Sequence, residues 1–245
     1  MNYTQYCKDW LSDIIFPIRC IECGRFNDDK FQGYMCGRCL RLIKFNRLFE
    51  CIGCKKNVPL GKTCYFCKDA NSIDQLLIAA DYKDSNVSRT LKFIKYRFIS
   101  ELIHPLFLIV KEYIKWLNTK KHLNIFEESP VIVPIPLYKT RYNWRGFNQS
   151  EILAKLVADK FQAEFGPFIL KRVKGSTPQA EIENREDRIK NMNNLFRVLN
   201  PSLISGRTVL LVDDVCTTGA TLNEAARVLK ANGAGKVVGL VVARG

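Results

Sequence analysis

The pattern of apolar and polar positions after residue 70 alternates between two periods. Apolar runs without polar alternation predict strands, and residues 131–133 and 208–212 are typical of strands that are covered on both faces. Apolar residues at three- and four-residue spacing predict amphipathic helices between these runs. The predicted strands cover residues 73–82, 131–133, 168–173, 208–212 and 236–243, and the predicted helices cover residues 87–98, 103–117, 149–165 and 222–232.

The order of these elements predicts an α/β fold. Strand–helix–strand repetition is typical of a parallel sheet with helices on both faces. In the last helix Leu222, Ala225 and Leu229 fall on one face, and Gly233 is a natural C-terminal stop. The polar segment from 177 to 191 suits either a mobile flap over a ligand or a solvated linker.

The composition of the chain changes near residue 70. Cysteines, glycines and short polar loops precede this point, whereas long apolar strands and amphipathic helices follow it. A chain of 245 residues is long enough for one ordinary domain and a small additional module. We therefore predict a cysteine-rich module at residues 1–70 and a larger α/β domain at residues 71–245.

The strand at 208–212 leads into the most informative segment of the chain, VDDVCTTGAT. Backbone N–H groups at the start of the next helix favour an anion, and a glycine lets the backbone approach it closely. Two aspartates would repel a phosphate, but they are good acceptors for the vicinal hydroxyls of a ribose. A helix cap explains one of these residues but not the whole series. The segment predicts a ribose-5-phosphate and pyrophosphate site formed by Asp213, Asp214, Thr217, Thr218, Gly219, Ala220 and Thr221.

A second anion-binding segment follows the strand at 131–133. Arg145 stands beside Gly146 just before a predicted helix, so a planar donor lies next to a backbone that permits close approach. Lys139 and Arg141 add less specific positive charge to the same segment. We predict that this segment binds a diphosphate, with an ordinary basic loop as the alternative.

Eight of the ten cysteines form four C-x-x-C pairs. Two such pairs provide four thiolates in tetrahedral arrangement, which suits Zn²⁺ or an iron–sulfur cluster, and we favour two structural Zn²⁺ ions. Sequential and interleaved pairing are both open. Cys216 stands apart from the pairs, and we interpret it as a packing residue. The predicted ligands are Cys20, Cys23, Cys36, Cys39, Cys51, Cys54, Cys64 and Cys67.

The cysteines could also form disulfides, but residues 1–18 contain Asp9 and Asp13 and lack the cationic start and apolar run of a secretory leader. The longest apolar run, 102–110, is too short to span a bilayer. We therefore expect a cytoplasmic protein without a transmembrane segment, in which paired thiols hold metal.

The chain carries a formal net charge of +14. Such a charge suits a polyanionic partner, most simply nucleic acid, although a generally basic proteome would also explain it. In the cysteine module Phe26, Phe31, Tyr34 and Tyr65 are interleaved with Arg25, Lys30 and Arg38, and these aromatic side chains could stack on bases. A purely structural cap on the larger domain is the alternative function of this module.

Two resemblances extend this interpretation. The segment VDDVCTTGAT resembles the signature of type I phosphoribosyltransferases. The resemblance implies phosphoribosyl pyrophosphate as ligand, with Asp213 and Asp214 on the ribose hydroxyls and the threonine-rich loop on the 5-phosphate. It also implies Mg²⁺, held mainly by oxygens of the ligand rather than by a protein cage.

Two zinc ribbons, then VPIP at 133–136, RGFNQ at 145–149 and finally the phosphate loop are together similar to the ComF/GntX competence family over essentially the whole chain. This resemblance implies a cytoplasmic protein of natural transformation, or of the use of DNA as a nutrient, that works on imported single-stranded DNA. The implied partners are helicase or recombination-loader proteins and the inner-membrane uptake machinery, so a position peripheral to that membrane is open. The segment between Gln179 and Arg188 is slightly longer than the family pattern, and we assign Gln179 no role.

Three functions compete at this point. The first is a DNA-handling competence protein that keeps a phosphoribosyl pyrophosphate site, and the second is an active phosphoribosyltransferase of nucleotide metabolism. No base-specificity hood is recognisable beyond residues 73–130, which weakens the second. The third is a ligand-sensing regulator, for which the chain offers no helix-turn-helix pattern.

Overall fold

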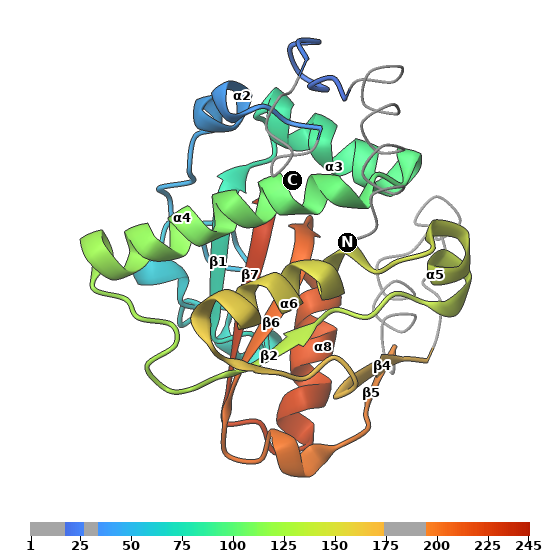
Figure 1. Ribbon diagram of the computed structural model, residues 1–245. Coiled ribbons are helices and arrows are strands. Elements are labelled where there is room, and N and C mark those ends of the chain that lie inside the picture. The colour runs from blue at the N-terminus through green and yellow to red at the C-terminus, as the bar shows by residue number, and fades with distance from the viewer. Residues whose placement is uncertain (1–17, 27–33, 174–194) are drawn as a thin grey trace, which may run out of the picture.

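A computed structural model describes residues 18–26, 34–173 and 195–245 (Figure 1). Its centre is a five-stranded sheet with the strand order β1-β7-β6-β2-β3. Every pair of neighbours in this sheet is parallel, so the strands end at the same edge. The strands are β1 Gln75–Asp81, β2 Val131–Pro134, β3 Glu164–Phe165, β6 Thr208–Cys216 and β7 Lys236–Arg244.

Both faces of the sheet are buried. In β1, Leu77 and Ala79 belong to the apolar cluster on one face, and Leu76 and Ile78 belong to the cluster on the other face. Side chains alternate across a strand, so a strand that is covered on both sides must be apolar at consecutive positions. The burial explains why the apolar runs predicted the strands.

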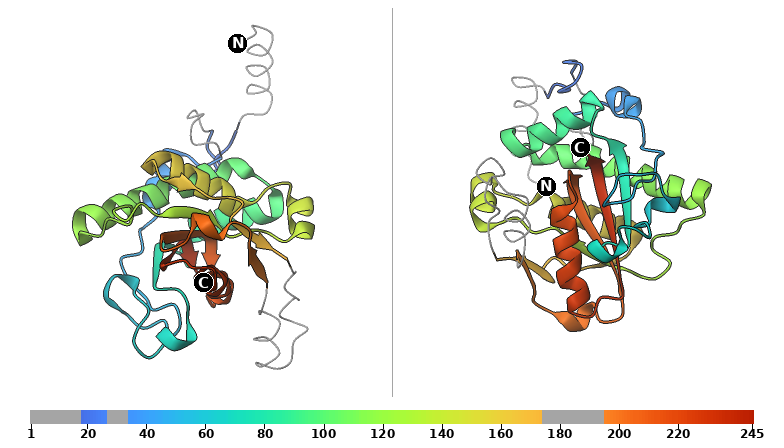
Figure 2. Two further views of the ribbon diagram at one scale, coloured as in Figure 1. Left: turned by 90° about the horizontal axis from the view of Figure 1, so that it is seen from below. Right: turned by 180° about the vertical axis from the view of Figure 1, so that it is seen from behind.

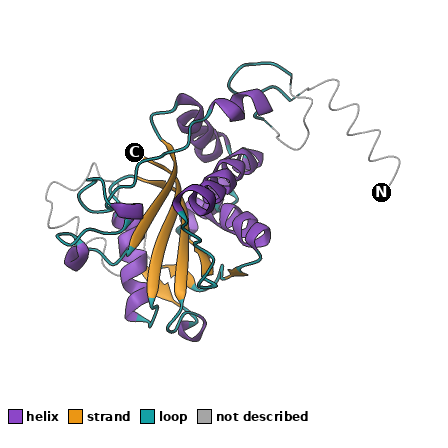
Figure 3. Ribbon diagram, turned by 90° about the vertical axis from the view of Figure 1, so that its left-hand side faces the viewer, coloured by secondary structure: helices purple, strands orange, loops and turns teal. Residues whose placement is uncertain are grey.

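Helices form a layer on each side of the sheet (Figure 2, left; Figure 3). The helices α3, α4 and α6 pack on one face, and α8 packs on the other. Their bounds are α3 Ser85–Arg97, α4 Ile103–Lys121, α6 Gln149–Phe161 and α8 Ala220–Ala231. The prediction of a parallel α/β sheet between helices is confirmed.

Several boundaries differ from the predicted ones. Helix α6 ends at Phe161 because Gln162 adopts a left-handed conformation with φ 54°, and the predicted last turn instead forms edge strand β3. Helix α4 continues to Lys121 before the left-handed His122. Strand β6 continues to Cys216 because β7 pairs with it along its whole length.

Two short elements were not predicted. Residues Lys139–Arg145 form helix α5 rather than a loop, and this helix ends at Gly146, where φ is 82°. Strand β4, Leu170–Arg172, pairs with an antiparallel strand β5, Phe196–Val198, which is too short to show a period in the sequence. The predicted flap at 177–191 lies outside the described residues.

The described residues of the cysteine-rich segment pack directly on the larger domain. An antiparallel bridge joins Phe45 to Ala80 of β1, and Met35 and Ile52 are buried in the clusters of opposite sheet faces. The division at residue 70 stays a prediction. The remaining short helices are α2 Gly37–Leu42, η1 Pro59–Gly61, η2 Lys68–Ala70, η3 Ser100–Leu102 and η5 Pro201–Leu203.

Candidate functional site

The predicted phosphate loop joins the end of β6 to the start of α8. Gly219 caps α8 in a left-handed conformation with φ 83°, which favours glycine. The first backbone N–H groups of this helix have no partner inside the helix, and its dipole favours an anion at this end. The structure thus places the predicted residues at one sheet edge: Asp213 and Asp214 in the last part of β6, Thr217, Thr218 and Gly219 in the connection, and Ala220 and Thr221 in the first turn of α8.

The carboxylate of Asp213 is fixed by two donors. The Ser150 hydroxyl donates to Asp213 Oδ1 over 2.7 Å, and the backbone N–H of Asp214 donates to the same oxygen over 2.9 Å. Burial and the neighbouring charge of Asp214 raise the pKa of Asp213 to about 7. A proton on this carboxyl would remove its unfavourable charge, and a further hydrogen-bond donor would stabilise its ionised form.

The carboxylate of Asp214 is paired with a lysine from a distant helix. Lys95 Nζ of α3 lies 2.8 Å from Asp214 Oδ2, and both side chains are largely buried. Burial disfavours the Lys95 charge, but the attraction of Asp214 outweighs it and raises the pKa of Lys95. The predicted helix at 87–98 gave Lys95 no role, whereas the structure brings its side chain to the acidic pair.

Arginines gather beside the acidic pair. Burial lowers the pKa of Arg145, the charge of Asp214 opposes this change, and Arg141 repels the Arg145 guanidinium. Arg172 of β4 is likewise affected by burial, by repulsion from Arg141 and by attraction to Asp213. Three guanidinium groups near one another favour an anion with several oxygens, such as a diphosphate.

The other predicted basic residue of this segment lies farther out. Lys139 is exposed at the start of α5, whereas Arg145 at its end is partly buried and donates to the Gln149 side chain. The Arg145 Nε is buried, and no hydrogen-bond partner for it exists in the described part of the chain. Arg145 therefore carries an unpaired buried donor beside the acidic pair, and Lys139 stays a prediction.

Sequence reasoning missed Ser150, Lys95 and Arg172. A signal existed for Ser150, because β2 and β6 are parallel neighbours and α6 begins beside the end of β6. Asn148 caps α6 by accepting from the Ser150 backbone N–H over 3.1 Å, and this cap fixes the first turn of the helix. Lys95 and Arg172 carry no comparable local signal.

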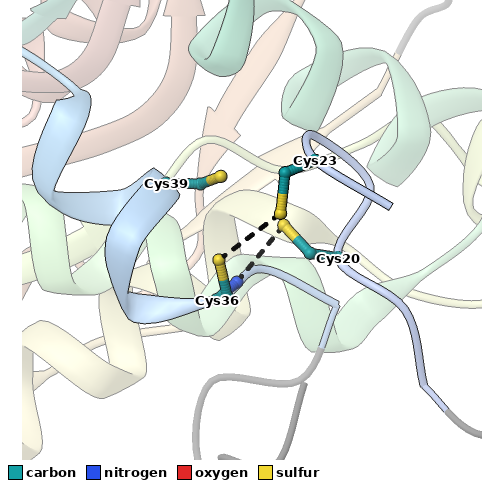
Figure 4. A group of neighbouring side chains, drawn as sticks. All are labelled: Cys20, Cys23, Cys36 and Cys39. Carbon is teal, nitrogen blue, oxygen red and sulfur yellow. Dashed lines mark hydrogen bonds between the residues drawn. The ribbon is translucent and has the colours of Figure 1, made fainter. Parts of the chain in front are cut away.

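The eight paired cysteines form two clusters. Cys20, Cys23, Cys36 and Cys39 make the first cluster, and their sulfur atoms lie within 4.8 Å of one another (Figure 4). The second cluster contains Cys51, Cys54, Cys64 and Cys67 with the same spread. The pairing is therefore sequential, one of the two arrangements that the spacing left open.

The sulfur geometry of both clusters fits a tetrahedral ion. The Cys23 and Cys36 sulfurs are 3.8 Å apart, and so are those of Cys54 and Cys64. A tetrahedron with zinc–sulfur distances of about 2.3 Å has edges of about 3.8 Å. These clusters could therefore hold Zn²⁺ in sites closed to further ligands.

Backbone donors prepare one thiol in each cluster for metal. Burial opposes ionisation of Cys20, but N–H groups that include that of Cys36 outweigh it and lower its pKa to about 7. In the second cluster the N–H of Cys64 contributes in the same way and the pKa of Cys51 falls to about 6. Burial and hydrogen bonds with the neighbouring thiols raise the pKa of Cys39 and of Cys67. A divalent cation in the cluster would favour the thiolate form of all four cysteines.

The second cluster lies directly behind the phosphate loop. A Cβ atom on Gly219 would come within 2.8 Å of Ile52 Cγ1, so Ile52 occupies the space that the glycine leaves free. The buried Arg244 donates to the carbonyl oxygens of Cys51 and Ile52 over 3.1 and 2.7 Å. Cys216, at the end of β6, is buried, and burial raises its pKa to about 11, in agreement with a packing role.

The aromatic residues predicted for the cysteine-rich segment differ in exposure. Phe26 and Tyr65 are exposed, with the cations of Arg19 and Lys68 each 4.3 Å from the ring centre. Tyr34 is partly buried against the core. Phe31 and Lys30 lie outside the described residues.

Comparison with known proteins places this architecture in a family. The model of the phosphoribosyl transferase domain family matches residues 101–244. The chain is 30% identical to Competence protein F of Haemophilus influenzae over 221 residues, which are 88% of this chain and 92% of that protein. The chain belongs to the ComF competence protein family. This ComF-family chain is also 27% identical to Competence protein ComFC of Bacillus subtilis, over 89% of its own length and 91% of the relative.

A partial match connects the ComF-family chain to a second group of relatives. It is 36% identical to DNA utilization protein YhgH of Escherichia coli over 43% of this chain and 45% of that protein. The match to the phosphoribosyl transferase family begins at residue 101, so Lys95 reaches the site from outside the matched region. Among the described residues, no helix has both the length and the apolar character needed to cross a membrane.

Proposed function

We propose that this ComF-family protein handles imported single-stranded DNA during natural transformation and binds phosphoribosyl pyrophosphate at the carboxyl edge of its sheet. The single observation that carries the ligand proposal is the pair Asp213 and Asp214 beside the N-terminus of α8. Two acceptors for ribose hydroxyls and one anion-binding helix start match the two halves of a ribose 5-phosphate. The names of the competence and DNA utilization relatives support the DNA proposal.

The other end of the proposed ligand meets the arginines. The buried Nε of Arg145 has no partner in the described part of the chain, and Arg141 and Arg172 add charge nearby. These groups suit the pyrophosphate, whose charge Mg²⁺ would partly neutralise through ligand oxygens. Lys95 Nζ lies 2.8 Å from Asp214 Oδ2 and holds this carboxylate in place to accept hydrogen bonds from the ribose hydroxyls.

The proposed partner of the protein surface is single-stranded DNA. The net charge of +14 favours a polyanion, because each neutralised phosphate releases a counterion. Helicase or recombination-loader proteins and the inner-membrane uptake machinery are the proposed protein partners, and the cytoplasm is the proposed place of action. The two clusters would hold structural Zn²⁺ through their thiolates.

The ligand proposal is tested by calorimetric titration of phosphoribosyl pyrophosphate with Mg²⁺. We expect Asp214→Asn to abolish measurable binding, because the amide is a weaker acceptor and leaves Lys95 without its counter-charge. Asp159→Asn, which removes an exposed carboxylate of α6, is the matched control and should bind like wild type. Unchanged affinity of the Asp214 variant would refute the site, and transformation frequency of the same two variants links the site to competence.

An active phosphoribosyltransferase is the second candidate function, because the acidic pair, the helix start and the basic segment converge at one edge. In that reaction the bond from ribose C1 to pyrophosphate breaks as an acceptor forms a new bond to C1, and positioning and electrostatics carry most of the catalysis. Release of pyrophosphate in the presence of a nucleobase or amine acceptor would favour this function. Tight binding of phosphoribosyl pyrophosphate without release of pyrophosphate would favour a competence protein that binds this ligand without catalysis.

A further inference from the structure

Four exposed aromatic side chains lie beside the proposed ligand site. We call Tyr96, Phe98, Tyr142 and Trp144 the α3–α5 aromatic patch, because they come from the end of α3 and from α5. Their exposed fractions are 65%, 38%, 47% and 60%. The Phe98 and Trp144 rings touch edge to face across the two helices, with centroids 4.8 Å apart. Large exposed rings that contact each other across two helices are typical of a binding surface.

Basic side chains surround this patch. Lys92 and Arg97 are exposed on α3, and Lys139 and Arg141 are exposed on α5. Proteins that bind single-stranded nucleic acid combine basic side chains with exposed aromatic rings. The cations contact the phosphates, and the bases stack on the rings. The four cations favour a nucleic acid over an apolar protein surface, which would offer them no negative charge.

The patch is continuous with the proposed ligand site. Lys95, which pairs with Asp214, directly precedes Tyr96, and Arg145, whose Nε is buried without a partner among the described residues, directly follows Trp144. Tyr96 also lies near Arg145. Each of the two helices therefore carries a residue of the candidate site and exposed rings within one helical turn of each other.

We propose that single-stranded DNA binds on the α3–α5 aromatic patch and that its bases stack on Trp144 and Tyr142. The strand then leads along the exposed cations toward the sheet edge where the ribose phosphate site lies. This inference rests on the proposed handling of single-stranded DNA and assigns that activity to one surface. This proposal places the binding of single-stranded DNA on the larger domain and not on the rings near the two cysteine clusters.

The test measures fluorescence anisotropy of labelled oligothymidine with the full-length, metal-loaded protein at low salt. We expect Trp144→Ala combined with Tyr142→Ala to weaken binding by about tenfold or more. Trp144→Phe with Tyr142→Phe keeps both rings and should retain wild-type affinity. The matched control is Tyr65→Ala with Phe66→Ala on the second cluster, whose rings are even more exposed.

Inorganic polyphosphate is the second probe, because it carries the charge of a strand without its bases. The alanine variant of the patch should bind polyphosphate as wild type does, which also shows that it is folded. Equal losses for both probes would overturn stacking, and loss in the second-cluster variant instead of the patch variant would overturn the location. Wild-type protein that binds no oligothymidine at low salt would refute the proposed function itself, whereas binding that survives loss of the patch rings refutes only this inference.

Discussion

Replacing Asp213 by asparagine should make the protein more stable and less able to bind its ligand. The folded protein raises the pKa of Asp213 from 3.8 to about 7, mainly by burial and next by the charge of Asp214. The asparagine oxygen can still accept from the Ser150 hydroxyl and from the backbone N–H of Asp214. The variant therefore removes an unfavourable charge and keeps both hydrogen bonds.

The size of the effect follows from the shift in pKa. One pKa unit corresponds to about 1.4 kcal/mol, so a rise of about three units costs at most about 4 kcal/mol of folding free energy when both states are ionised. Asp213 keeps partial contact with solvent, so a gain of about 2 to 4 kcal/mol is expected for the variant. The cost is absent below the pKa of the unfolded chain, grows as the pH rises between about 4 and 7, and is complete above the pKa of the folded protein.

Urea unfolding of wild type and the Asp213→Asn variant at about pH 5 and about pH 8 measures this effect. The thiols of Cys20 and Cys51 titrate in the same range in both proteins, so the difference between the two proteins isolates the carboxyl. We expect the advantage of the variant to be larger at the higher pH. An advantage that is absent at about pH 8, or equal at both pH values, would contradict the raised pKa.

Three further predictions follow from contacts around the loop. Lys95→Met removes a charge that lowers the pKa of Asp213. The pH midpoint for binding phosphoribosyl pyrophosphate, measured by calorimetry, should therefore rise by about one unit. An unchanged midpoint would exclude this coupling. Gly219→Ala should lower the free energy of unfolding by about 1 to 3 kcal/mol, because φ is +83° and the new Cβ meets Ile52. In a double-mutant cycle, Ile52→Ala should therefore cost less stability in the Gly219→Ala background than in wild type. Cys64→Ser, in the cluster behind the loop, should weaken binding of phosphoribosyl pyrophosphate by about fivefold or more, whereas Cys36→Ser in the first cluster should not. Metal analysis measures the zinc content of both variants. Equal losses of affinity would show that the second cluster does not support the loop.

Local patterns were enough to predict most of the fold, and they also supplied most residues of the candidate site, which stays a prediction. Strands β1, β2, β6 and β7 contain continuous apolar runs because both of their faces are covered, so the pattern and the burial have one cause. The phosphate loop and the C-x-x-C pairs are also local, because each places its functional groups within a few residues. Helix α5 escaped prediction because all seven of its residues, Lys139–Arg145, lack a buried position and hence an apolar stripe.

Local sequence patterns could not predict contacts between segments that are distant in the sequence. Ile52 fills the space beside Gly219 only because the second cluster packs behind β6, and nothing near either residue announces this contact. Such a contact explains the glycine more fully than ligand approach alone, because a side chain there would displace Ile52 as well as strain the turn. The same glycine thus links the second cysteine cluster to the proposed phosphate loop.

Helix α3 shows why a site and a binding surface can share one short segment. A helix turns by about 100° per residue, so consecutive residues point in different directions. Lys95 points inward to Asp214, whereas Tyr96 points outward into the exposed patch. Any force that a bound strand exerts on the outer face must therefore act on a helix whose inner face holds one of the two acids. We therefore expect strand binding at the patch and ligand binding at the proposed site to be coupled through α3. Such a coupling is reciprocal. Phosphoribosyl pyrophosphate that displaces Lys95 from Asp214 should change the affinity for a single strand by the same factor as the strand changes the affinity for phosphoribosyl pyrophosphate.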